Sequence, residues 1–103
     1  YDLIILDPPA FAKHKKVLNN ALQGYRKLNA KAFEKIRPGG ILFTFSCSQV
    51  VSKENFRLAV FSAAAQSGRN VRILHQLTQP ADHPVNIYHP EGEYLKGLVL
   101  YVE

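Results

Sequence analysis

Two short motifs in this chain, each following an apolar run, carry side chains that could do chemistry. The first is Asp7-Pro8-Pro9, which follows residues 1–6. The two prolines fix φ and remove two backbone donors, so the Asp7 carboxylate and nearby carbonyls remain as rigidly placed acceptors. Such acceptors suit the exocyclic amino group of a base, and Phe11 could stack on the face of that base. A turn or helix cap at Asp7 and simple packing of Phe11 are the alternative interpretations.

The second motif is Ser46-Cys47-Ser48, which follows the apolar residues 41–45. A single buried cysteine is usually an inert small hydrophobic residue, but a thiolate at the end of a strand could act as a nucleophile. Addition of a thiolate to carbon 6 of cytosine would make carbon 5 able to take a methyl group from a sulfonium. Asp7 could bind the N3/N4 edge of the same base, which must leave its stack to be reached.

The hydrophobic pattern predicts the elements that position these motifs. Short apolar runs indicate strands, and apolar residues recurring at three- and four-residue steps indicate amphipathic helices. The predicted strands are residues 1–6, 41–45, 71–77 and 95–102, and the predicted helices are residues 18–36 and 52–68. Ser52 is the expected N-cap of the second helix. Strands that alternate with helices predict an α/β fold with a mainly parallel sheet, and the long loop at 78–93 should return the last strand antiparallel.

This arrangement should bring the two motifs together. A right-handed crossover joins the first two strands, so they are expected to be neighbours in the sheet. Ligands of open parallel sheets bind at the carboxyl ends of the strands. Asp7 and Cys47 should therefore face a common site, with the loop at 78–93 emerging on the same side.

Composition and charge narrow the class of protein. The chain has 103 residues, which fits one domain, and a net charge of +5. Between residues 11 and 37 there are eight Lys or Arg and one acid, Glu34. This stretch is either a solvated helix face or a surface that attracts a polyanion. The single cysteine and the absence of zinc-like Cys/His spacing predict no metal site and a reducing, cytoplasmic setting. No apolar run approaches a membrane span.

The first residues suggest a part of a larger protein. The chain opens inside an apolar run without Met, which we interpret as the carboxyl-terminal portion of a longer chain. The outer edge of the strand at residues 1–6 would then lack its neighbour. An apolar, unpaired edge invites pairing with another copy, so a homodimer through this strand is predicted.

Together with two later motifs, these residues resemble a known family. The chain is similar to the bacterial large-subunit ribosomal RNA cytosine-C5 methyltransferases that carry an amino-terminal PUA domain, a class I family dependent on S-adenosylmethionine. The likeness runs over essentially the whole chain. It is carried by Asp7-Pro8-Pro9-Ala10-Phe11, Gly39-Gly40-Ile41-Leu42-Phe43-Thr44-Phe45-Ser46-Cys47-Ser48, Ala81-Asp82-His83-Pro84 and Pro90-Glu91-Gly92-Glu93-Tyr94-Leu95-Lys96-Gly97.

The resemblance implies a Rossmann-like fold of seven strands, of which residues 1–103 would supply the last four. The upstream half that binds most of the cofactor, S-adenosylmethionine, would be absent, and no Gly-x-Gly-x-x-Gly occurs here. Ribosomal RNA would be the partner. Cys47 and Asp7 match the catalytic residues, and Asp7 and Pro8 would also form a wall of the cofactor pocket. The expected substrate-binding residues are Pro8, Pro9, Phe11, Ser46, His83 and Tyr94.

Several alternatives stay open at this point. His83 could equally anchor its own loop. Pro9 occupies the place where many cytosine-C5 enzymes carry a second cysteine, so the base that removes the carbon 5 proton is unidentified. An amino methyltransferase would use Asp7-Pro8-Pro9 to hold an adenine or guanine amino group, with Cys47 merely packed. A non-catalytic RNA-binding module would depend on its basic side chains alone.

Overall fold

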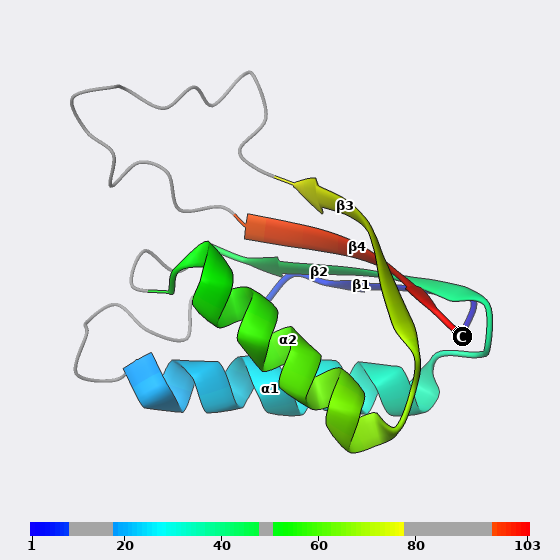
Figure 1. The fold of residues 1–103 in the computed structure, drawn as a ribbon, viewed down its shortest axis with the longest axis horizontal. Helices are drawn as coiled ribbons and strands as arrows, with labels where there is room; N and C mark the ends of the chain where they lie inside the picture. The colour runs from blue at the N-terminus through cyan, green and yellow to red at the C-terminus, as the bar shows by residue number, and fades with distance from the viewer. Residues whose placement is uncertain (9–17, 48–50, 78–95) are drawn as a thin grey trace.

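The computed structural model describes residues 1–8, 18–47, 51–77 and 96–103 of the chain. Its elements are β1 (Leu3–Leu6), α1 (Leu18–Lys35), β2 (Gly40–Ser46), α2 (Lys53–Ser67), β3 (Val71–Leu77) and β4 (Lys96–Val102) (Figure 1). Each of these elements was predicted from the sequence, and the observed ends differ by no more than about two residues, within the usual uncertainty of element boundaries.

The described strands form a single sheet in the order β1-β2-β4-β3. β1 pairs in parallel with β2, whereas β4 is antiparallel to both β2 and β3. β1, β2 and β3 thus run in one direction, and the prediction that the last strand is antiparallel is confirmed. Because β4 lies between β2 and β3, the described sheet contains one parallel pair of neighbours and two antiparallel pairs. The order of the strands along the sequence did not predict that β4 would lie between β2 and β3.

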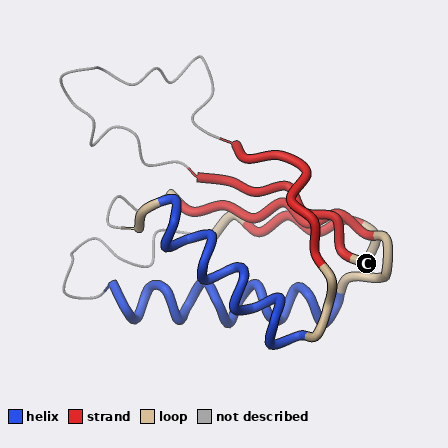
Figure 2. The backbone as a smooth tube through the Cα atoms, viewed as in Figure 1, coloured by secondary structure: helices blue, strands red, loops and turns tan. Residues whose placement is uncertain are grey.

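Both helices pack on the same face of the sheet (Figures 1 and 2). β2 shows why: Leu42 and Thr44 are buried toward the helices, whereas Ile41 and Phe43 on the other face are half-buried. Buried apolar residues of α1, α2 and the sheet form one core. The largest buried apolar side chains of this core are Tyr25, Phe33, Leu42, Val51, Phe56, Leu100 and Val102.

Capping fixes the ends of α2. The side chain of Ser52 accepts a 3.0 Å hydrogen bond from the backbone N–H of Asn55, which confirms Ser52 as the N-cap. At the other end, Gly68 adopts φ 73° and its N–H donates to the carbonyl of Ala65. A left-handed residue at this position ends the helix, and glycine adopts that conformation without a Cβ penalty.

Candidate active site

The ends of β1 and β2 meet at one edge of the sheet, as the sequence predicted. In the parallel register, Leu6 lies opposite Thr44. Asp7 directly follows the first of these strands and Cys47 directly follows the second. Neighbouring strands lie about 4.8 Å apart, so the structure brings these two predicted residues to adjacent strand ends.

The three described motif residues at these ends differ in exposure. Asp7 is exposed, while Pro8 and Cys47 are half-buried. The carboxylate can therefore reach a ligand, and Cys47 is partly accessible. This arrangement is compatible with a carboxylate and a sulfur acting on one substrate.

Ser46 occupies a different environment from the one expected of a substrate-binding residue. Its side chain is fully buried, and its hydroxyl donates a 2.9 Å hydrogen bond to the hydroxyl of Tyr25 in α1. Side chains alternate between the two faces of a strand, so Ser46 lies on the same buried face of β2 as Leu42 and Thr44. This alternation could have predicted the burial of Ser46 from the sequence. A substrate contact by Ser46 stays a prediction, whereas its contact with Tyr25 supports the end of β2.

Tyr25 is itself held firmly. The side-chain amide of Asn29 donates a 2.8 Å hydrogen bond to the backbone carbonyl of Tyr25. The ring of Tyr25 meets that of Phe56 in α2 edge to face, with centroids 5.6 Å apart and planes at 83°. Ring pairs with this geometry are favourable beyond their buried area. The segment that carries Cys47 is thus supported by both helices.

Lys96 is a further candidate site residue, to which the sequence analysis assigned no role. It begins β4 and is the cross-strand partner of Ser46. Its side chain is buried, with 5% of its surface exposed. Burial lowers the pKa of the Lys96 ammonium group; attraction to Cys47 opposes this shift and repulsion from Lys53 adds to it. The residues next to Lys96 in the sequence did not indicate that its side chain would be buried.

The remaining predicted site residues cannot be placed. Pro9, Phe11, His83 and Tyr94 lie outside the described residues, and their roles stay predictions. Among the residues that the structure describes, no group of three or more His, Cys, Asp or Glu could hold a metal ion. Likewise, no described helix is long and apolar enough to cross a membrane.

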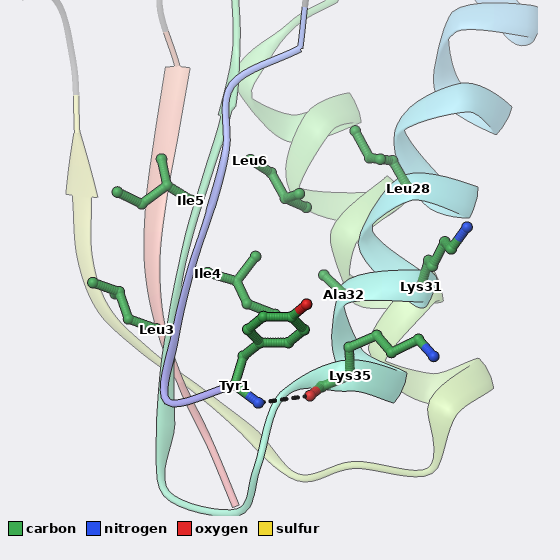
Figure 3. A pocket seen from close by; sticks show the side chains of 9 residues that line it. All are labelled: Tyr1, Leu3, Ile4, Ile5, Leu6, Leu28, Lys31, Ala32 and Lys35. Atoms are coloured by element: carbon green, nitrogen blue, oxygen red, sulfur yellow. Dashed lines mark hydrogen bonds between the residues drawn. The ribbon is translucent and has the colours of Figure 1, made fainter.

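A groove runs along the outer edge of β1 rather than at the strand ends. Figure 3 shows side chains from both β1 and α1 around it, and the amino group of Tyr1 donates a 3.1 Å hydrogen bond to the carbonyl of Lys35. Leu3 and Ile5 are 53% and 62% exposed on this strand. β1 is therefore an apolar edge of the described sheet, as predicted, whereas a homodimer through it stays a prediction. The groove is lined by Tyr1, Leu3, Ile4, Ile5, Leu6, Leu28, Lys31, Ala32 and Lys35.

Curated relatives carry a common name. The ribosomal RNA large subunit methyltransferase I of Tolumonas auensis is 49% identical over 97% of this chain, and that of Aeromonas salmonicida is 46% identical over the same share. This chain is similar to ribosomal RNA methyltransferases over nearly its whole length. It spans 25% of the length of each of these two relatives. No family model matches the chain.

Solved structures show the same fold. A putative methyltransferase, SMU.776, complexed with SAH superimposes with a TM-score of 0.80 at 25% identity, covering 99% of this chain and 26% of its own. A putative SAM-dependent methyltransferase from Streptococcus mutans superimposes with a TM-score of 0.78 at 23% identity, over 99% of this chain and 25% of its own. The predicted Rossmann-like methyltransferase fold is confirmed. The names of the relatives agree with the predicted family at the level of ribosomal RNA methyltransferases, and none specifies the atom that is methylated.

Proposed function

We propose that the full-length protein is an S-adenosylmethionine-dependent methyltransferase acting on ribosomal RNA, and that this chain supplies the substrate side of its catalytic domain. The similarity to the named relatives supports the reaction class. The observation that carries the proposal is the position of Asp7 and Cys47 at the adjacent ends of two parallel strands. Ligands of sheets with this architecture bind at such ends.

The target that these residues fit best is carbon 5 of a cytosine. The Cys47 thiolate adds to carbon 6, and the electrons of the carbon 5–carbon 6 double bond shift to carbon 5 and the ring carbonyl. Asp7 holds the N3/N4 edge of the base and stabilises this adduct. Bound S-adenosylmethionine would supply the methyl group that carbon 5 takes up, and its sulfonium would become a neutral thioether. Removal of the carbon 5 proton re-forms the double bond and releases the thiolate.

The chemistry of the described residues fits the cofactor. S-adenosylmethionine supplies an electrophilic methyl group on a positively charged sulfonium. The exposed carboxylate of Asp7 is a suitable neighbour for that charge, and Pro8 beside it is half-buried. Asp7 and Pro8 would form one wall of the cofactor site. We expect the 103-residue chain alone to be inactive, because it contains no glycine-rich loop of the kind that binds such cofactors.

RNA is the expected partner, and α1 offers basic side chains to it. Lys27, Lys31 and Lys35 are exposed and lie four residues apart, so they share one side of the helix. Such a row can neutralise phosphates and release counterions. The target cytosine must leave its stack to reach the strand ends. We place this activity in the cytoplasm.

Covalent trapping tests the proposal. RNA that contains 5-fluorocytosine should form a stable adduct with the full-length protein in the presence of S-adenosylmethionine, because fluorine replaces the proton that must leave. Cys47→Ala should form no adduct and should methylate no carbon 5. An amino methyltransferase would leave the RNA untrapped and place the methyl group on an exocyclic nitrogen. That result, or full activity of Cys47→Ala, would contradict the proposed chemistry.

A further inference from the structure

A groove between α2 and β3 lies at the edge of the described sheet opposite β1. From α2 it is lined by Arg57, Phe61 and Ala65, which recur every four residues and therefore share one side of the helix. Ile73 of β3 and Leu100 of β4 line it as well. The α2–β3 groove has a volume of about 350 Å³. Clefts of roughly 300–1,000 Å³ hold small organic groups, so one unpaired base can enter it.

Large apolar side chains at the α2–β3 groove are open to solvent. Phe61 is 68% exposed and Ile73 is 39% exposed. Single exposed apolar residues are ordinary on a protein surface, but an exposed ring beside a groove offers a face on which another ring can stack. Ala64 and Ala65 are the neighbours of Phe61 one turn further along the helix, and their small side chains leave space beside the ring.

The charged side chains of the groove are positive. Arg57 lies one turn before Phe61 on the same side of α2 and is exposed. Arg69, beyond the other end of α2, donates to the backbone carbonyls of Phe33 and Ile36 at 2.7 and 3.0 Å, which fix its guanidinium group in place. Among the described residues that line the groove, none is acidic. A polyanion that also carries flat rings is therefore the complementary ligand, with phosphates for the arginines and bases for the exposed ring.

The α2–β3 groove adjoins the region of the candidate active site. Arg57 and Leu98 line both this groove and a small cavity that reaches Lys96. Lys96 is the cross-strand partner of Ser46, which directly precedes Cys47. An RNA chain that is held at the strand ends can therefore extend along the groove.

We propose that the α2–β3 groove binds single-stranded RNA beside the methylated base, with an unpaired base on the ring of Phe61 and an adjacent phosphate on Arg57. The inference rests on the proposed function, because it assigns the groove to the same RNA substrate. Bases of an unpaired strand stack on aromatic side chains whatever their sequence, whereas a duplex keeps its bases paired. A second copy of this chain carries a net charge of +5 and is less complementary to a positive groove.

Binding of a labelled single-stranded oligocytidine to the full-length protein, followed by fluorescence anisotropy, tests the groove. Phe61→Leu keeps an apolar side chain but removes the ring, and should weaken binding about 10-fold, as expected for the loss of one base–aromatic stack. Phe61→Tyr keeps the ring and should bind like the unaltered protein. Arg57→Gln should reduce the slope of log affinity against log salt by about 0.7, the contribution of one phosphate contact to a single strand.

Leu58→Ala is the matched control, because Leu58 is 60% exposed on α2 but does not line the groove; its affinity should not change. Unaltered affinity of Phe61→Leu, or an equal loss in Leu58→Ala, would overturn the inference. Unaltered affinity together with the change of a dimer to a monomer in light scattering would make the groove an interface between copies instead.

A separate readout distinguishes this inference from the proposed chemistry of Cys47. If Phe61→Leu loses affinity but the unaltered protein is not trapped by RNA that contains 5-fluorocytosine, the chemistry of Cys47 is wrong and the groove is supported. If the unaltered protein is trapped but Phe61→Leu binds oligocytidine normally, the groove is wrong and the chemistry is supported.

Discussion

The hydroxyl of Ser46, the last residue of β2, donates a 2.9 Å hydrogen bond to the hydroxyl of Tyr25 in α1. Both side chains are fully buried, so water does not compete for this bond. The strand end next to Cys47 is therefore connected to a helix that precedes it by about twenty residues in the chain, as expected for buried polar groups that specify one packing arrangement.

Tyr25→Phe tests this connection. Removing the hydroxyl deprives Ser46 of a buried partner while the ring contact with Phe56 can persist. We expect a loss of about 1–2 kcal/mol in the free energy of unfolding, measured by urea titration, and slower covalent trapping by Cys47. Tyr1→Phe is the control, because Tyr1 is 77% exposed. A Tyr25→Phe protein with unaltered stability and trapping would show that the bond does not support the site.

Gly97→Ala should disturb the contact between β4 and β2. A Cβ at this position would lie 2.6 Å from Cδ1 of Phe45 and 3.2 Å from Cβ of Leu77. Overpacking of this kind costs about 1–3 kcal/mol, which a lower melting temperature would reveal. Phe45→Leu should recover part of the loss when combined with Gly97→Ala, since it removes the ring. Equal stability of Gly97→Ala and the unaltered protein would contradict the close approach.

Ser52→Ala should loosen the start of α2. The substitution removes the side chain that accepts from the backbone N–H of Asn55 at 3.0 Å. Loss of an N-cap typically costs about 1 kcal/mol, again measurable by urea titration. Ser62→Ala on the exposed face of the same helix should cost nothing comparable. If both variants lose the same stability, capping is not the cause.

The buried ammonium of Lys96 should make stability depend on pH in the alkaline range. Burial lowers its pKa in the folded state from the ordinary 10.5, so the unfolded chain binds more protons between the two values. Stability contributed by this site therefore rises as the pH increases through that window. Lys96→Met removes the dependence and should be at least as stable as the unaltered protein near neutral pH. Urea titrations from neutral pH to about 10 would show the difference narrowing, and a difference independent of pH would refute this assignment.

The sequence by itself determined the elements and the two strand ends that carry the chemistry. Periodicity and capping are local signals, so α1, α2 and the N-cap Ser52 could be predicted from neighbouring residues alone. A right-handed crossover between consecutive strands has few solutions, which is why Asp7 and Cys47 could be placed side by side.

Only the tertiary structure decided what surrounds Cys47. The insertion of β4 between β2 and β3 is a long-range pairing, and it sets Lys96 opposite Ser46. The burial of Ser46 against Tyr25 likewise depends on how α1 packs on the sheet. Pairing partners and packing depend on contacts between residues far apart in the chain, and a local pattern of apolar and polar residues does not encode which of them meet.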